Sequence, residues 1–190
     1  MTISYRRARD LDFEQIVHLQ NLYLEANLNT DQKQDGFLSG QFTTDQFCQI
    51  DADGAVVVAY EQTDDGSDVK AFLCASSPAF NLPFALPRAM IESFPQAIFE
   101  GKPLSQQAVL VAGPVCVDVS CRGKGLVREL YRAISGVVPD LYEVVVVFVS
   151  VANLRSINAH KNLGMSVVSG FSFNEKEYVT MACSIANFRG

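Results

Sequence analysis

The sequence predicts one mixed α/β domain of the α+β kind, in which helices cover a sheet. Three observations predict it. Short apolar runs typical of strands alternate along the chain with segments whose apolar residues recur at helical spacing. A strand, a glycine-rich loop and an amphipathic helix follow one another between residues 109 and 138. Pairs of strand-like runs joined by polar turns, typical of antiparallel hairpins, stand on either side of that unit.

The composition indicates an ordered globular protein with a single domain over residues 1–190. Hydrophobic residues make up 48% of the chain and charged residues 19%, which is enough to bury a core. The formal net charge of −6 is evidence against a broad surface for nucleic acid. No apolar run reaches the roughly 18 residues that span a bilayer, and no apolar signal segment follows Met1. The sequence therefore predicts neither a nucleic-acid partner nor a membrane partner.

The five cysteines favour a cytoplasmic protein without a metal site. They form no C-x-x-C pair, and several stand in apolar stretches. Neither His18 nor His160 has cysteines at the spacing of zinc ligands. We expect the cysteines to be mostly reduced and buried, like small hydrophobic residues.

The chain is expected to begin with a strand and a helix. Residues 3–7 read as the strand, and Asp10 is placed to cap the helix. One face of this helix is apolar and consists of Phe13, Ile16, Val17 and Tyr23. The polar, glycine-punctuated residues 27–40 predict a loop with a short helical turn, a place for substrate contacts. Residues 44–50 predict another short helix.

A hairpin and a proline-rich segment are expected next. Residues 55–60 and 69–74 read as its strands, joined by the turn-rich residues 63–68. Five prolines stand between residues 78 and 103. They predict a helix near residues 87–94 with irregular flanks.

The second half carries clearer patterns. Residues 109–119 predict a strand interrupted by Gly113-Pro114, which suits a bulge or a splay. The valine-rich residues 144–151 predict a strand covered on both faces. The apolar face of the helix between these strands consists of Leu126, Val127, Leu130, Tyr131, Ile134, Val137 and Val138.

A helix and a hairpin are expected to close the chain. Residues 153–163 predict the helix, which Gly164 would end as a C-terminal cap. Residues 167–173 and 178–185 predict the hairpin, joined through residues 174–176.

Residues 122–127 form the main candidate for a binding site. At the start of a helix the backbone N–H groups have no intrahelical acceptors, and the helix dipole favours negative charge there. Gly123 and Gly125 let the backbone approach an anion, and Arg122 and Lys124 add positive charge. The loop lacks the P-loop pattern and the third glycine of the dinucleotide fingerprint. It predicts a phosphate site of another kind, the alternative being a tight turn with two solvated cations.

Two consecutive segments resemble motifs of the GCN5-related N-acetyltransferase (GNAT) superfamily. Residues 115–130 (VCVDVSCRGKGLVREL) are similar to its acetyl-CoA motif, a strand followed by [QR]-x-x-G-x-[GA] and a helix. Residues 153–165 (NLRSINAHKNLGM) resemble the next motif, with an asparagine, a small residue three later and a helix ending in Leu-Gly-[FM]. The two stand in the family's order with a valine-rich strand between them. The acetyl-CoA-binding core is accordingly expected over about residues 109–173.

The resemblance implies a mixed, mostly antiparallel sheet of about seven strands with a central, splayed parallel pair, flanked by about four helices. It implies an N-acetyltransferase that moves the acetyl group of acetyl-CoA, by direct attack, to a primary amine of a small molecule or peptide. Acetyl-CoA is then the co-substrate and CoA the product. The alternatives are a non-catalytic acetyl-CoA-binding sensor and an interaction module that uses the fold alone. Because open sheet edges invite pairing, the fold analogy also favours a homodimer through the C-terminal hairpin.

The resemblance also implies roles for single residues. The backbone amides that would bind the pyrophosphate are those of Arg122, Gly123, Lys124, Gly125, Leu126 and Val127. Val127 replaces the family's Gly or Ala, and its side chain crowds the anion unless it points into the core. Val117 and Val119 would offer backbone groups to the pantetheine arm, and Asn153 would contact that arm or the acetyl end. His160 stands where the family commonly has the tyrosine that protonates the leaving thiolate, or it is a helix-surface residue. Asp118 is a candidate general base acting through water, or a charged residue at a strand end.

Overall fold

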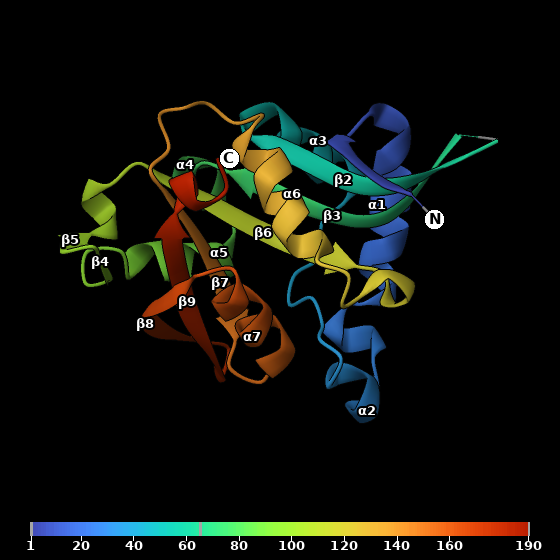
Figure 1. Cartoon of the computed structure of the whole chain (residues 1–190). Helices are drawn as coiled ribbons and strands as arrows, with labels where there is room; N and C mark the ends of the chain where they lie inside the picture. Colours follow the sequence, from blue (N-terminus) through green and yellow to red (C-terminus); the bar gives the residue numbers. More distant parts are fainter. Residues whose placement is uncertain (1, 65, 190) are drawn as a thin grey trace.

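A computed structural model describes residues 2–64 and 66–189 of the chain (Figure 1). Its strands are β1 (Ile3–Arg7), β2 (Ala55–Thr63), β3 (Gly66–Ser76), β4 (Ile98–Phe99), β5 (Lys102–Pro103), β6 (Val109–Val117), β7 (Val144–Ser150), β8 (Ser166–Phe173) and β9 (Lys176–Ser184). Its α-helices are α1 (Asp10–Leu22), α2 (Thr30–Lys33), α3 (Thr44–Asp53), α4 (Pro78–Asn81), α5 (Ala85–Glu92), α6 (Leu126–Ser135) and α7 (Leu154–Asn162). Four short 3₁₀ helices are η1 (Glu25–Asn27), η2 (Leu104–Gln106), η3 (Val119–Cys121) and η4 (Ile185–Asn187).

Seven of these strands form one sheet in the order β1-β2-β3-β6-β7-β9-β8. Every neighbouring pair is antiparallel except β6 and β7, which are parallel and central. The predicted sheet of about seven mostly antiparallel strands with one parallel pair is therefore confirmed. Both predicted hairpins are also present, although Asp65 in the turn of the first lies outside the described residues.

The central pair is splayed, as predicted. β6 and β7 are paired only from Val109↔Val144 to Val111↔Val146. On its other side β6 shifts register against β3 between Leu73 and Ala75, opposite the Gly113-Pro114 interruption. Beyond this point β6 and β7 run apart (Figure 1). The second half of β6 thus presents one edge without a partner strand.

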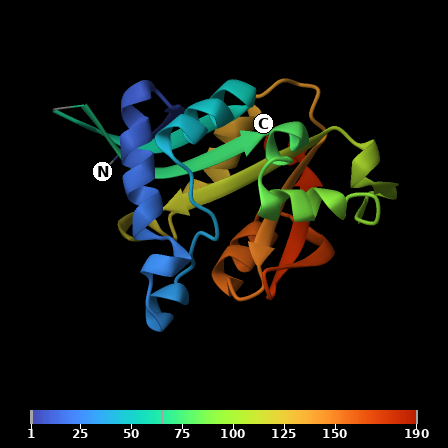
Figure 2. The same ribbon diagram turned by 180° about the vertical axis from the view of Figure 1, so that it is seen from behind.

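Helices cover both faces of the sheet, as Figures 1 and 2 show from opposite sides. The side chains of Val145 and Val147 pack with α6 and α7 in one buried cluster. Those of Val144 and Val146 pack with Met90 of α5 in another, and α1 and α3 pack on the neighbouring strands β2 and β3. The valine run is thus a strand covered on both faces, as its composition predicted.

Local boundaries differ from the sequence prediction in three places. Asp10 is the first residue of α1 and not its cap, and the Asp12 carboxylate accepts from the Arg9 N–H at 2.7 Å. β6 ends at Val117, so Val119 lies in η3 and not in the strand. α6 ends at Ser135, and Val137 beyond it is 39% exposed and not part of the apolar face.

The described residues contain seven α-helices where the sequence predicted about four. The additional ones include α2 and α4, single turns in the polar and proline-rich segments that the sequence marked as mainly irregular. No helix in the described part of the chain is long and apolar enough to cross a membrane. All five cysteines are free thiols, and every one except Cys48 is buried.

Candidate active site

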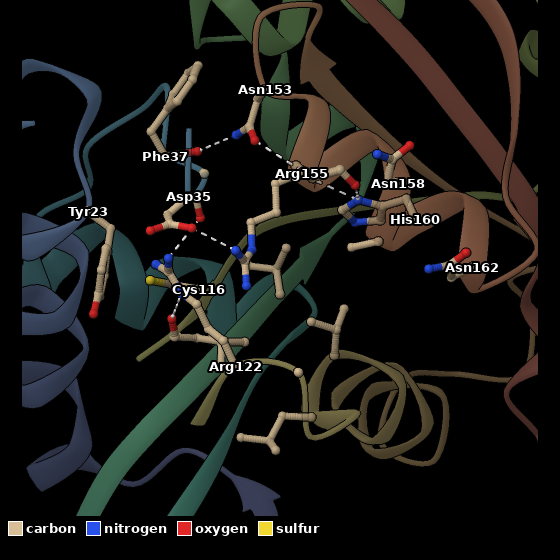
Figure 3. Close-up of a pocket in the computed structure, with 18 of the residues that line it drawn as sticks. Tyr23, Asp35, Phe37, Cys116, Arg122, Asn153, Arg155, Asn158, His160 and Asn162 are labelled. Carbon is tan, nitrogen blue, oxygen red and sulfur yellow. Dashed lines mark hydrogen bonds and ion pairs between the residues drawn. The ribbon is translucent and has the colours of Figure 1, made fainter. Parts of the chain in front are cut away.

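A cavity of about 750 Å³ lies where β6 and β7 diverge (Figure 3). Five segments build it: the end of α1, the loop after α2, the second half of β6, the glycine loop with the start of α6, and α7. Residues that line it include Tyr23, Asp35, Phe37, Leu38, Val115, Cys116, Val117, Arg122, Gly123, Gly125, Val127, Asn153, Arg155 and His160. The two segments that resemble the GNAT motifs therefore lie side by side at one cavity.

The glycine loop presents an open set of backbone donors. Gly123 and Gly125 have φ values of +76° and +79°, which glycine adopts without strain. A Cβ atom at either position would meet no atom within 4 Å. Within the described residues no oxygen accepts a hydrogen bond from the N–H groups of residues 123–127. These five groups, called the amide nest below, form a site for an anion at the start of α6.

The side chain of Arg122 is part of the cavity wall. Its Nε donates to Val117 O at 3.0 Å, and its Nη1 donates to Asp35 O at 2.8 Å. The guanidinium also lies over the Tyr23 ring, 4.5 Å from the centroid. Arg122 thus adds positive charge to the cavity while it holds two segments together.

Lys124 and Val127 contribute less to the anion site than their positions in the motif suggest. The ammonium of Lys124 donates to Ser120 O at 3.0 Å, and this exposed residue does not line the cavity. Val127 is half-buried, lines the cavity and packs against the core beneath α6. The side chain of Val127 therefore does not fill the amide nest, and it leaves room there for an anion.

The free edge of β6 supplies further backbone groups. Asp118 N–H donates to Lys70 O of β3 at 2.8 Å, so the alternation of the ladder turns the N–H and C=O of Val117 towards the splayed edge, where the C=O already accepts from Arg122 Nε. Val115 shares that direction and also lines the cavity. Val119 differs, because it is 61% exposed, and its N–H already donates to the Tyr23 hydroxyl at 2.9 Å. The edge is thus built from Val115 and Val117 and not, as the sequence suggested, from Val117 and Val119.

Residues 34–38, called the strap below, cross the cavity between the end of β6 and the start of α7. Phe37 O accepts from Asn153 Nδ2 at 2.8 Å, and the Asp35 carboxylate pairs with Arg155 Nη1 at 2.8 Å (Figure 3). Arg122 adds its bond to Asp35 O, and Leu38 at the end of the strap is bonded through its backbone to Tyr23 O and Glu25 N–H. The sequence marked residues 27–40 as a region for ligand contacts, but no local pattern signals these distant partners.

Asn153 has a structural role at the rim of the cavity. It is 5% exposed, and its Oδ1 accepts from Ser156 N–H at 3.1 Å, which caps α7. Its Nδ2 holds Phe37 of the strap. The side-chain amide of Asn153 therefore already has two hydrogen-bond partners. The ligand contact predicted for Asn153 would have to share this amide with them.

Replacing Asn153 with alanine is expected to lower the free energy of unfolding by about 2 kcal/mol. The lost cap accounts for about 1 kcal/mol, and the Phe37 carbonyl left without its donor for about 1 kcal/mol. Asn153→Asp keeps the cap acceptor and loses only the donor. In both variants we expect faster hydrogen exchange of Leu38 N–H, which donates to Tyr23 O at 2.8 Å.

The control is Thr43→Ala, which removes the cap of α3 and leaves the strap contacts in place. Urea denaturation and amide exchange measure both effects. Unchanged exchange of Leu38 in Asn153→Ala would show that the strap does not depend on this bond.

His160 is buried at the cavity and is not a helix-surface residue. It is 2% exposed, and its Nδ1 lies 2.8 Å from Ser156 O, a carbonyl that can only accept. Nδ1 therefore carries the proton, and Nε2 accepts from the Tyr131 hydroxyl at 3.1 Å. Burial lowers the pKa of His160 below its ordinary value of 6.5, which favours this neutral form. Neither ring nitrogen offers a proton to the cavity, so the geometry lends no support to the predicted general acid.

The stability of the protein is expected to fall as the pH drops below 6.5, because the unfolded chain then binds a proton that folded His160 excludes. The contribution is fully present above pH 6.5 and is worth roughly 1.4 kcal/mol for each unit by which the pKa is lowered. Urea denaturation at about pH 7.5 and about pH 5.5 measures it.

His160→Gln is expected to lose this pH dependence, and the matched variant His18→Gln, at the exposed histidine of α1, to keep it. If both variants kept the same slope as the wild type, the pH dependence would have another source.

Asp118 lies on the opposite side of the sheet edge and does not line the cavity. It lines a separate hollow of about 370 Å³ beside α1. Its carboxylate accepts from Ser120 N–H at 2.9 Å and from the Tyr23 hydroxyl at 3.3 Å. Burial raises its pKa, but these hydrogen bonds and the charge of Lys70 outweigh burial and lower it. An anion with satisfied oxygens is a poor base, so the geometry favours the role of a charged residue at the strand end.

The comparisons with known proteins establish the fold. No protein-family model and no curated protein matches the chain. Among solved structures, a chain of the NatC complex bound to Gag peptide and CoA gives a TM-score of 0.64 at 12% identity, over 97% of this chain and 99% of that chain. The phosphinothricin acetyltransferase of Sinorhizobium meliloti, solved with acetyl-CoA, gives 0.61 at 16% identity, over 97% and 89%. The chain has the GNAT fold.

A third solved structure with the GNAT fold is named for a different acceptor, an alanine of a ribosomal protein. The ribosomal-protein-S18-alanine N-acetyltransferase of Escherichia coli gives a TM-score of 0.57 at 11% identity, over 97% of this chain and 94% of that chain. These identities are low, so the likeness confirms the GNAT resemblance at the level of the fold. The substrate has to be argued from the site itself.

Proposed function

We propose that the chain is an acetyl-CoA-dependent N-acetyltransferase that acts on a primary amine of a small molecule or a peptide. One observation carries the proposal: the amide nest and the free edge of β6 face the same cavity. The nest fits a diphosphate, and the edge of β6 fits the amide groups of a pantetheine arm. The cavity volume of about 750 Å³ lies in the range of sites for small molecules and cofactors.

Bound acetyl-CoA would supply an activated thioester, and the residues of the chain would position it. Backbone N–H groups at the edge of β6 can stabilise negative charge on a carbonyl oxygen. The acceptor nitrogen forms the new bond to the acetyl carbon while the carbon–sulfur bond breaks with its electron pair on sulfur. The nitrogen loses one proton to water. Holding both substrates in reach of each other provides much of the rate enhancement.

Two features of the cavity support direct attack. Cys116 lines it, but burial raises the pKa of this thiol to about 12, so it is no nucleophile at neutral pH. Asp35 is the one carboxylate among the described residues that line the cavity, and it is paired with Arg155. Neither Cys116 as a nucleophile nor Asp35 as a base is thus favoured, and we infer direct attack with water as the proton acceptor.

The proposed acceptor class includes both small molecules and peptides, because the names of the GNAT-fold neighbours include both kinds of compound. Among them are an enzyme named for phosphinothricin, one named for a ribosomal-protein alanine and a complex that holds a peptide. The predicted homodimer through the C-terminal hairpin stays a prediction. β8 is an edge strand that a second copy could pair with, and light scattering at several concentrations would test it.

The proposal is tested by calorimetric titration with acetyl-CoA and with CoA, followed by a thiol-release assay over a panel of small amines and peptides. Binding with turnover supports it. Binding without turnover on any amine would favour the acetyl-CoA sensor instead. No binding at millimolar acetyl-CoA would overturn both and leave a GNAT fold used for another purpose.

A further inference from the structure

The side chain of Arg122 links the end of β6 to the strap. Its Nε donates to Val117 O, the last carbonyl of β6, at 3.0 Å. Its Nη1 donates to Asp35 O of the strap at 2.8 Å, and all three residues line the cavity (Figure 3). This side chain with its two hydrogen bonds is called the Arg122 bridge below.

The Arg122 bridge uses a backbone acceptor that the proposed cofactor needs. A pantetheine arm that pairs with the splayed edge of β6 would donate an amide N–H to Val117 O. Arg122 Nε already donates to that oxygen, and the guanidinium lies 4.5 Å from the centroid of the Tyr23 ring, which holds it there. An arm bound along the end of β6 therefore has to displace Arg122.

The amide nest offers Arg122 another partner. Arg122 directly precedes Gly123, the first residue of the nest. The planar guanidinium matches the oxygens of a phosphate, to which it can donate two parallel hydrogen bonds. A diphosphate in the nest therefore favours the same movement of Arg122 that the pantetheine arm requires.

The strap depends on the Arg122 bridge on one of its two sides. Among the described residues, Arg122 makes the one hydrogen bond from the glycine loop to the strap. On the other side Asn153 and Arg155, at the start of α7, hold Phe37 O and the Asp35 carboxylate. Loss of the bridge thus detaches the strap from β6 and leaves it attached to α7.

We propose that Arg122 is a positioning residue that holds the strap closed over the empty cavity, and that acetyl-CoA releases the strap by breaking the Arg122 bridge. The inference rests on the proposed function and adds a regulatory step at the same site. The pantetheine arm takes Val117 O, Arg122 turns to the diphosphate, and Asp35 O loses its donor. The wall of the cavity that the strap forms is therefore released only when the cofactor is in place.

The first test uses pantetheine, which lacks the phosphates of CoA and so probes the β6 edge alone. In Arg122→Met we expect pantetheine to bind about tenfold more tightly than in the wild type, because the arm no longer displaces a hydrogen-bonded side chain. NMR titration that follows the backbone amide signals of Val115 and Val117 measures the Kd. Unchanged or weaker binding to Arg122→Met would overturn the inference.

Lys124→Met is the matched control. It removes a second cation from the same loop, but the Lys124 ammonium donates to Ser120 O and does not contact the strap. We expect this variant to bind pantetheine with the Kd of the wild type. Tighter binding to both variants would show that the charge of the loop, and not the Arg122 bridge, opposes the arm, and would overturn the inference.

The second test follows the strap in the wild type and needs no variant. Gly36 N–H donates to Lys33 O at 3.0 Å. We expect bound pantetheine or CoA to speed the hydrogen exchange of this N–H about tenfold, although a bound ligand ordinarily slows exchange. In Arg122→Met the exchange is expected to be fast already and to stay the same when the ligand is added. Slower or unchanged exchange of Gly36 in the liganded wild type would overturn the inference.

The two tests separate this inference from the proposed function. Turnover of acetyl-CoA with no release of Gly36 would overturn the inference and leave the proposed function intact. Tighter binding of pantetheine to Arg122→Met and release of Gly36, without turnover on any amine, would support the inference and overturn the transferase. Failure of both pantetheine and CoA to bind would overturn the two together.

Discussion

Gly125→Trp is expected to abolish acetyl-CoA binding. Gly125 has φ +79° and open space where a side chain would stand, so an indole there would cover the amide nest. Several charge-assisted hydrogen bonds of roughly 1.5–3 kcal/mol each would then be lost, and the Kd would rise at least about a hundredfold. Calorimetric titration with acetyl-CoA measures the change.

The matched control is Gly101→Trp in the turn between β4 and β5. Gly101 has φ +80° and also meets no atom within 4 Å of a built Cβ, so tryptophan causes comparable backbone strain. We expect similar losses of stability in both variants but loss of binding only at Gly125. Equal binding by both variants would place the diphosphate elsewhere.

Gly54→Ala is expected to destabilise the fold strongly. A Cβ at Gly54 would lie 2.2 Å from Ala75 O, a backbone atom of β3, which is paired on both sides with β2 and β6. Gly54 follows the last residue of α3 directly, and β2 begins at the next residue. Relief of the clash has to shift a helix or a strand, so we expect a loss of roughly 3 kcal/mol or more in the free energy of unfolding.

Gly40→Ala serves as the control for this variant. A Cβ at Gly40 would meet nothing within 4 Å. We expect its free energy of unfolding to stay within about 0.5 kcal/mol of the wild type in urea denaturation. A Gly54→Ala protein as stable as Gly40→Ala would mean that the α3–β2 junction is looser than the structure shows.

The parts of the fold that the sequence could predict are those with local signals. The alternation that turns Val145 and Val146 to opposite faces is a property of a single strand. At the glycine loop, the end of a strand, two glycines with positive φ and the start of a helix follow one another within a dozen residues. Gly113-Pro114 interrupts its own strand, so the splay could also be predicted from neighbouring residues.

What the sequence could not provide are contacts between distant segments. Nothing near Phe37 indicates that its carbonyl binds Asn153, 116 positions away. His160 is buried against Tyr131 of another helix, and a helical pattern alone does not distinguish this position from one at the helix surface. The apolar side chain of Val119 continues the strand pattern, but the cap that Asp118 provides for η3 ends the strand two residues earlier.

The short pairing between β6 and β7 has a consequence for how the molecule opens. Because only three residue pairs join these strands, the sheet consists of two leaves, β1-β2-β3-β6 and β7-β9-β8. Each leaf is a continuous hydrogen-bonded unit, and the seam between them is the weakest line in the sheet. A ligand in the cavity touches β6 on one leaf and α7, which follows β7, on the other. We expect the empty protein to show two steps of hydrogen exchange, one for each leaf, and the liganded protein to exchange as a single cooperative unit.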